Sequence, residues 1–274
     1  MYKIMISVRN RLAITTKCIA AITKHSTIPH EIYVYDNCTS YLVNEHFMYW
    51  SLLYQKGIIK QLVINTKEST FNAFSKAVAF NQFLMNHEQD PDKDKYDFLL
   101  LLDNDIIVFP GFDKVLKDAW TDVKKYNLNN IKIITQLPGG IMSKKELGEK
   151  IAGFHAKTGK CGGSGFWALQ PNFAREIGCL DILPLVGLNK KHDQNYWTKL
   201  EKFSKGKDYI LGLDAQLALH MGAISGSICN TLTRNKNKST EELIKFEESE
   251  KHINSLSFDQ FFESIKKDKE KYRW

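Results

Sequence analysis

Two carboxylates stand at the end of a short, strongly apolar segment near the middle of the chain. Residues 98–102 are all hydrophobic, and Asp103 and Asp105 follow them with Asn104 between. So short an apolar run is typical of a strand buried on both faces of a parallel sheet. Ligands of such sheets bind beyond the carboxyl ends of the strands. Two hard oxygen ligands there can hold Mg²⁺ or Mn²⁺ against a diphosphate, which predicts a site for a nucleotide, a metal and a leaving group.

Other polar residues follow other expected strands. Asp36 could accept hydrogen bonds from a nucleobase or ribose, or it could begin an Asx-turn. Arg9 and Arg11 come just after the first strand, where a planar cation suits a base edge or a diphosphate, although either could be a surface charge. His220 follows an apolar segment and could complete a metal shell, or it could be a hydrogen-bonded core histidine.

The elements that must position these residues alternate between strand and helix. The first half of the chain predicts strands over 3–8, 31–35, 58–64 and 97–102, and helices over 15–24, 71–85 and 112–126. Strands over 131–135, 166–169, 208–213 and 216–220 and a short helix over 172–177 follow, with a flexible glycine-rich loop at 157–165. This order indicates a mostly parallel, doubly wound α/β sheet. From Thr240 the chain is charged and helical, and this tail either packs on the domain or serves as an interaction helix.

Composition sets broad limits on the class of protein. The chain has 274 residues with 43% hydrophobic content, enough for one large α/β domain, and no apolar run approaches the length of a membrane span. Five cysteines without metal-type spacing indicate reduced thiols in a cytoplasmic protein. The net charge of +7 is compatible with an anionic ligand such as a sugar nucleotide, a nucleic acid or a membrane face.

Four segments together resemble the GT-A glycosyltransferases, in particular the family-2-like nucleotide-sugar transferases. These segments are 6–11 (Ile-Ser-Val-Arg-Asn-Arg), 34–40 (Val-Tyr-Asp-Asn-Cys-Thr-Ser), 101–105 (Leu-Leu-Asp-Asn-Asp), and 192–194 (His-Asp-Gln) with 220–222 (His-Met-Gly). The resemblance covers roughly residues 3 to 222, and Cys38 stands where the family usually has Gly. It implies a GT-A (Rossmann-like) domain over 1–230, with a nucleotide-binding half (1–110) and an acceptor half (111–230), and a helical C-terminal extension over 231–274.

The resemblance also implies roles for individual residues. Asp193 would be the general base of an inverting transfer, with Asp181 and Asp214 as rivals. Asp103, Asp105 and His220 would hold Mn²⁺ or Mg²⁺. The donor would contact Ser7, Arg9, Arg11, Asp36, Asp103 and Asn104. Trp167 and Trp197 could stack on sugar faces, with core packing as the alternative. Gly163, with Gly162 and Gly165, would shape the acceptor side.

The expected activity is transfer of a sugar from a nucleotide-sugar donor, UDP-linked by preference, to a hydroxyl. The acceptor is left open between a surface glycan or lipid-linked intermediate, with peripheral membrane contact, and a hydroxymethylated base in DNA. A nucleotidyltransferase is disfavoured because the loop after the first strand, 9–13, has no glycine. A non-catalytic nucleotide-sugar-binding module is the third class.

Overall fold

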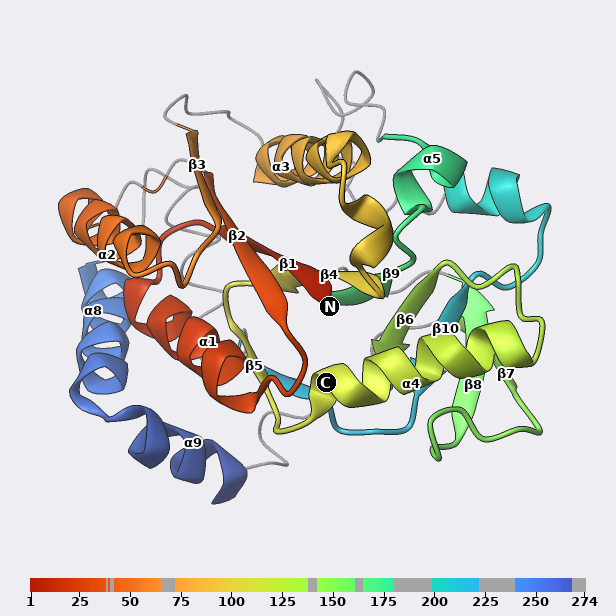
Figure 1. Ribbon diagram of the computed structural model, residues 1–274. Helices are drawn as coiled ribbons and strands as arrows, with labels where there is room; N and C mark the ends of the chain where they lie inside the picture. The colour runs from red at the N-terminus through yellow and green to blue at the C-terminus, as the bar shows by residue number, and fades with distance from the viewer. Residues whose placement is uncertain are drawn as a thin grey trace.

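The computed structural model describes residues 1–37, 39, 42–65, 72–137, 142–160, 165–179, 199–221 and 240–267 (Figure 1). Its strands are β1 (Tyr2–Val8), β2 (His30–Asn37), β3 (Gln61–Asn65), β4 (Phe98–Asp103), β5 (Ile106–Val108), β6 (Ile133–Gln136), β7 (Met142–Glu146), β8 (Ala156–Lys160), β9 (Phe166–Leu169), β10 (Ile210–Leu213) and β11 (Ala218–His220). Its helices include α1 (Leu12–His25), α2 (Val43–Gln55), α3 (Asn72–Gln89), α4 (Phe112–Lys125), α5 (Phe173–Ile177), α8 (Thr240–Ser255) and α9 (Phe258–Lys267).

Within the described residues the main sheet has nine strands in the order β3-β2-β1-β4-β9-β6-β10-β8-β7. The strands β3, β2, β1 and β4 run parallel, while β9 is antiparallel to both of its neighbours, β4 and β6. The chain proceeds outward from β1 to β3 on one side and continues with β4 on the other, so the strand order reverses at β1 and β4. Such a switch point is where open α/β sheets bind ligands. The predicted mostly parallel α/β fold is confirmed.

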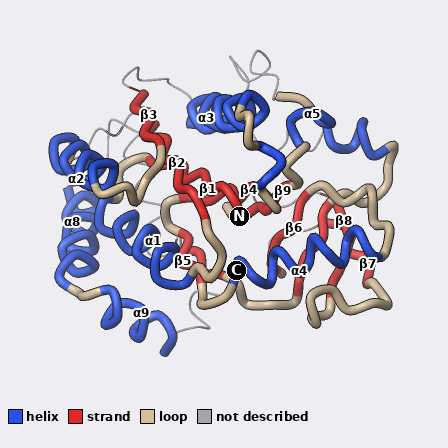
Figure 2. Tube along the Cα trace, in the orientation of Figure 1, coloured by secondary structure: helices blue, strands red, loops and turns tan. Residues whose placement is uncertain are grey.

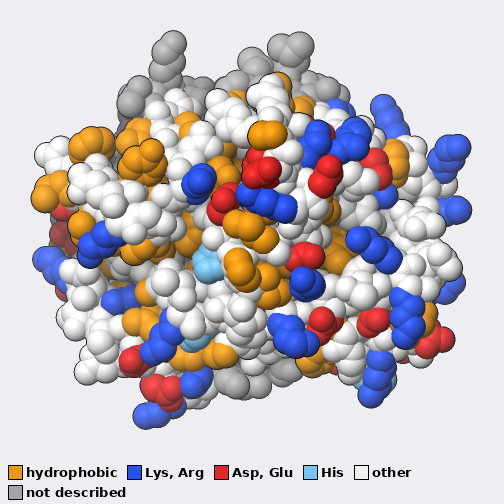
Figure 3. Space-filling view, in the orientation of Figure 1, with side chains coloured by type: hydrophobic (Ala, Val, Ile, Leu, Met, Phe, Trp, Pro, Cys, Tyr) orange, Lys and Arg blue, Asp and Glu red, His pale blue; other side chains and the backbone are white. Residues whose placement is uncertain are grey.

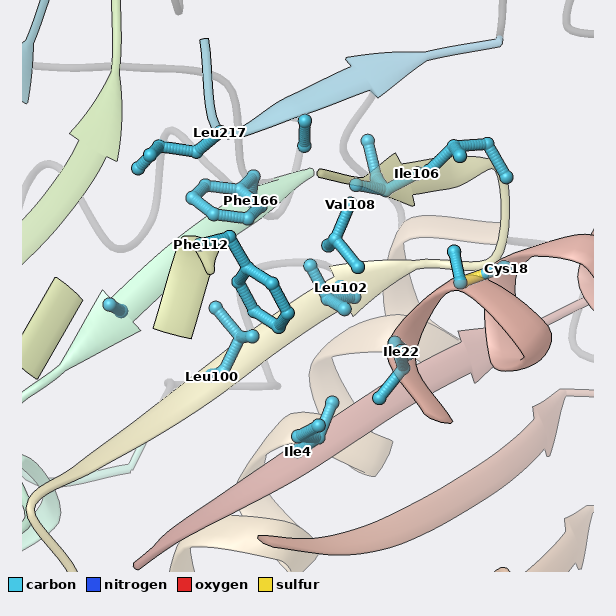
Figure 4. Packing of buried hydrophobic residues seen from close by; sticks show 14 of the residues in the cluster. Ile4, Cys18, Ile22, Leu100, Leu102, Ile106, Val108, Phe112, Phe166 and Leu217 are labelled. Carbon is cyan, nitrogen blue, oxygen red and sulfur yellow. The ribbon is translucent and has the colours of Figure 1, made fainter. Parts of the chain in front are cut away.

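Each face of the sheet has its own hydrophobic core, because side chains of a strand alternate between the faces. Ile4 and Ile6 belong to the core beneath α1 and α4, whereas Met5 belongs to the core beneath α3. Figure 4 shows the first core, in which Ile4, Leu100 and Leu102 pack with Ile22, Phe112 and Phe166. Helices therefore cover both faces, as the tube trace also shows (Figure 2).

The two C-terminal helices of the described chain pack on α1 (Figure 1). Ile253 of α8 and Phe262 of α9 are buried in the same core as α1. The His25 ring lies 4.6 Å from the Phe262 ring, and the Lys17 ammonium donates to the Leu256 carbonyl at 2.5 Å. The described part of the tail thus packs on the domain, the first of the two alternatives the sequence left open. No helix among the described residues is long and apolar enough to cross a membrane.

The elements that the sequence did not predict include α2, β8 and the short strands β5 and β7. Helix α2 was not predicted, because its apolar residues do not form one buried stripe: Val43, Phe47, Met48, Leu52 and Tyr54 are exposed. Apolar side chains gather over α2 in Figure 3, while acidic and basic ones are interspersed on the rest of that face. Strand β8 occupies part of the predicted glycine-rich loop, since Thr158 pairs antiparallel with Leu211. Cys18 and Cys179, the two cysteines in the described chain, are free thiols.

Candidate active site

Strand register brings three of the predicted residues to one edge of the sheet. Val8 pairs with Asp36 of β2, and Ser7 pairs with Asp103 of β4, so the carboxyl ends of three neighbouring parallel strands carry these polar groups side by side. The Asn37 amide links two of the strands by donating to the Ser7 hydroxyl at 3.0 Å. These carboxyl ends of the strands lie at the switch point of the sheet.

Asp105 is the centre of a buried charged cluster. Its carboxylate accepts from Arg11 Nη1 at 2.5 Å, and His220 Nε2 lies 3.4 Å from its other oxygen. The side chains of Asp105 and Arg11 are only 4% and 8% exposed, and that of His220 is 33% exposed. Burial opposes ionisation of Asp105, but His220 and Arg11 together hold its pKa well below the usual range. Burial likewise lowers the pKa of His220, but the Asp105 carboxylate outweighs it and raises that pKa.

Local pairing explains why His220 meets Asp105. Strand β11 runs antiparallel to β5 with His220 opposite Ile106, and the Met221 amide donates to the Asp105 carbonyl at 2.8 Å. Gln136 braces this arrangement: its side-chain oxygen accepts from the Leu217 and Ala218 amides at 2.9 and 2.7 Å. Sequence reasoning missed Gln136, although a polar residue at the end of a predicted buried strand was a usable signal.

Arg11 reaches Asp105 from a strained corner after β1. Asn10 and Arg11 both have left-handed backbone conformations, with φ of 56° and 60°, which non-glycine residues adopt at a cost. The Asn104 amide stabilises the corner by donating to the Asn10 carbonyl at 3.3 Å and to the Thr15 hydroxyl at 2.7 Å. Asn104 is 7% exposed, so in this structure its amide braces the loop.

Asp103 is the more open carboxylate of the pair. Its side chain is 29% exposed and accepts from Lys76 Nζ of α3 at 2.5 Å. The Asp103 amide donates to the Gly165 carbonyl, which ties the end of β4 to the residue just before β9. Lys76 was not foreseen as a site residue, although it stands near the start of a helix that the sequence did predict.

The Asp36 carboxylate accepts hydrogen bonds from the loop after β2 and from α2. It accepts from the Thr39 amide at 3.0 Å and from the Trp50 indole at 3.1 Å, and the residue is 3% exposed. His46 lies beside it, with Nδ1 3.9 Å from the carboxylate, and burial lowers the pKa of His46. The Thr39 amide lies three residues beyond Asp36, so this local contact differs from the Asx-turn, in which the side chain bonds to the backbone two residues on. Trp50 and His46 come from α2, which is why the sequence did not bring them to the site.

Of the remaining predicted residues, some lie in the described part of the chain and the others lie outside it. Trp167 is 1% exposed and packs in the core beneath α3, as the core-packing alternative describes. Arg9 is half-buried after β1, and Asp214 is exposed beyond β10. The other predicted residues lie outside the described residues: Asp193, Gly163, Trp197, Gly162 and Asp181.

The Asp105 and His220 side chains are placed so that they could supply part of the ligand shell of a divalent cation. Two ligands about 2.1 Å from an octahedral ion lie roughly 3 Å apart, and Asp105 Oδ1 and His220 Nε2 are 3.4 Å apart. Within the described chain no group of three or more acidic, His or Cys side chains gathers to hold an ion. Mg²⁺ sites commonly use one or two protein carboxylates, with substrate phosphates and water supplying the other ligands. Asp105 and His220, with Asp103 nearby, would hold the ion.

Solved structures with a similar fold include three glycosyltransferases of the GT-A type. The S. aureus TarS 1-349 structure matches with a TM-score of 0.50 and 13% identity over 90% of this chain and 71% of that one. The mannosyltransferase PcManGT from Pyrobaculum calidifontis, in complex with GDP-Man and Mn²⁺, matches with a TM-score of 0.51 and 10% identity. The match covers 92% of this chain and 69% of that one. GalNAc-T7 with UDP, GalNAc and Mn²⁺ matches with a TM-score of 0.50 and 13% identity, over 98% of this chain and 57% of that one.

These matches establish the fold. By sequence, no protein-family model and no curated protein matches the chain. The chain nevertheless has the GT-A fold that the four sequence segments predicted.

Proposed function

We propose that this protein is a metal-dependent, inverting GT-A glycosyltransferase that transfers a sugar from a nucleotide-sugar donor, UDP-linked by preference, to a hydroxyl group. The observation that carries the proposal is the cluster of Arg11, Asp105 and His220 beside Asp103. It stands at the switch point of a sheet whose fold is that of GT-A glycosyltransferases. The Mn²⁺ complexes of two fold neighbours, one with UDP and one with GDP-Man, support a divalent cation and a nucleotide donor.

The side chains at the proposed donor site have different roles. Arg11 compensates one oxygen of the buried Asp105, which leaves the oxygen facing His220 for a cation. When bound, the cation would neutralise charge that develops on the nucleoside diphosphate as it leaves. Lys76, on the more open Asp103, brings a second positive charge to the same edge, where a diphosphate would lie.

Acceptor activation is assigned to Asp193. A carboxylate there would take the proton of the acceptor hydroxyl as its oxygen attacks the anomeric carbon from the face opposite the leaving group. One base suffices because a nucleoside diphosphate is already a good leaving group. The stereochemical part of the proposal depends on Asp193, so the anomeric configuration of the product, read by NMR, tests it. Retention of configuration would contradict the inverting assignment.

The acceptor class is testable through its dependence on salt. DNA binding by a basic protein weakens steeply as salt concentration rises, because phosphate contacts release counterions. A DNA acceptor with a hydroxymethylated base therefore predicts activity that falls steeply with salt. Salt-insensitive transfer to a free oligosaccharide would instead support the glycan or lipid-linked acceptor. The cytoplasmic location stays a prediction.

Donor turnover tests the activity itself. Purified protein is offered UDP-, GDP- and dTDP-sugars, with and without candidate acceptors, in Mn²⁺ or in chelator. The proposal predicts nucleoside diphosphate release from one donor class in Mn²⁺ and its loss in chelator. The proposal is wrong if no donor is turned over with any acceptor while nucleotide still binds, since that result describes a binding module.

A further inference from the structure

The first turn of α1 is capped by a residue from the far end of the chain. Helix α1 begins after Arg11, which has a left-handed backbone, offers no side-chain cap, and is followed by no acidic residue in the first turn. The first amide groups of a helix have no acceptor within the helix, so they need one from elsewhere. Glu250 of α8 supplies one: its carboxylate accepts from the Ala13 amide at 2.9 Å, and the residue is 6% exposed.

Contacts on the C-terminal side of Glu250 hold α8 and α9 against α1. Ile253, one turn further along α8, is buried in the shared core. Lys17 of α1 donates to the Leu256 carbonyl between α8 and α9, and Lys24 pairs with Asp259 of α9. The Glu250 carboxylate is therefore held in place at the start of α1.

The charges of Glu250 and Arg11 act on one another. Burial raises the pKa of Glu250, while the hydrogen bond from Ala13 and the positive charge of Arg11 oppose this rise. Arg11 thus interacts electrostatically with two buried carboxylates, Asp105 of the candidate metal site and Glu250 of the C-terminal helix. Asp105 makes a direct ion pair with Arg11 at 2.5 Å.

We propose that Glu250 is a positioning residue for Arg11. By fixing the Ala13 amide two residues away, it holds the strained corner at Asn10 and Arg11 in the conformation that aims the guanidinium at Asp105. This inference rests on the proposed function, because the Asp105 cluster is where the nucleotide and its cation would bind. It makes α8 part of the scaffold of the active site.

The test compares three single variants of the full-length chain. Glu250→Met removes the acceptor but keeps the side-chain length and suits a buried position. Glu250→Gln keeps an oxygen that accepts from Ala13. Ile253→Ala weakens the packing of α8 without touching the carboxylate, so it is the matched control. Affinity for UDP and for GDP in Mn²⁺ is measured by calorimetry, and stability by urea unfolding.

The proposal predicts a specific pattern across these variants. Glu250→Met weakens nucleotide binding about tenfold, Glu250→Gln stays within about threefold of wild type, and Ile253→Ala loses stability but not affinity. In an Arg11→Ala background, Glu250→Met causes no further loss of affinity, because its effect passes through Arg11. Wild-type affinity in Glu250→Met, or an equal loss in Ile253→Ala, overturns the proposal.

Failure of the proposed function gives a different result. If wild-type protein binds neither UDP nor GDP, the donor site itself is refuted. The unfolding free energies of Glu250→Met, Arg11→Ala and the double variant then decide the positioning role. Non-additive values support it, and additive values overturn it.

Discussion

Arg11 and Asp105 form a buried ion pair with a 2.5 Å contact between residues 94 positions apart in the chain. Charges this far from water are tolerated only when each is compensated. Arg11 compensates one carboxylate oxygen of Asp105, and the partly exposed His220 faces the other. The pair therefore holds the Asp105 carboxylate in its ionised form within the site.

Removing one member of this pair should be costly. Arg11→Ala leaves the Asp105 carboxylate buried beside His220 alone, and we expect the free energy of unfolding to fall by about 3–5 kcal/mol in urea denaturation. The double variant Arg11→Met/Asp105→Leu should lose less than Arg11→Ala, because no charge is left unpaired. A double variant that is less stable than Arg11→Ala would argue against a buried, coupled pair.

His220 should matter for the cation more than for the fold. We expect His220→Ala to weaken Mn²⁺-dependent nucleotide binding by at least about tenfold, since one of two protein ligands is lost. Its melting temperature should fall less than that of Arg11→Ala, because the His220 side chain is 33% exposed and Arg11 still compensates Asp105. His252→Ala, an exposed histidine on α8, is the control. Equal affinities in both variants would remove His220 from the site.

Acid stability should depend on a pair at the opposite end of the sheet. Burial opposes ionisation of Asp90, but hydrogen bonds from Lys3, the Asp92 amide and Tyr96 hold its pKa at about 2. A pKa below the unfolded value stabilises the fold above about pH 4. This stabilisation is lost as the pH falls from about 4 to about 2.

The corresponding measurement is a comparison with Asp90→Asn. The difference in unfolding free energy between wild type and this variant should be constant above about pH 5 and shrink as the pH approaches 2. A difference that does not change with pH would show that Asp90 acts only through hydrogen bonding.

The sequence predicts most of the sheet because its central strands are short apolar runs. Strand β4 is the clearest case, since Phe98 to Leu102 are buried on both faces. Asp103 and Asp105 could be located from the end of that run alone. The GT-A fold followed from such strand ends and the motifs around them.

What the sequence could not predict depends on tertiary contacts. Lys76, Gln136 and Glu250 reach the site from elements far from it in the chain, and a single sequence does not reveal which helix face meets which strand end. Helix α2 was missed because its apolar residues point in several directions, and Trp50 was missed with it. Both alternatives stayed open for Trp167 because an aromatic residue on a predicted strand has the same pattern whether it faces core or ligand.

The most direct test of the central claim is a calorimetric titration of the protein with UDP in Mn²⁺ and again in chelator, in parallel with Asp105→Asn. If Asp105 holds a cation against a nucleoside diphosphate, wild-type binding should weaken at least about tenfold in chelator. Asp105→Asn in Mn²⁺ should bind as weakly as the chelated wild type. UDP binding of equal strength in all three conditions would contradict the account.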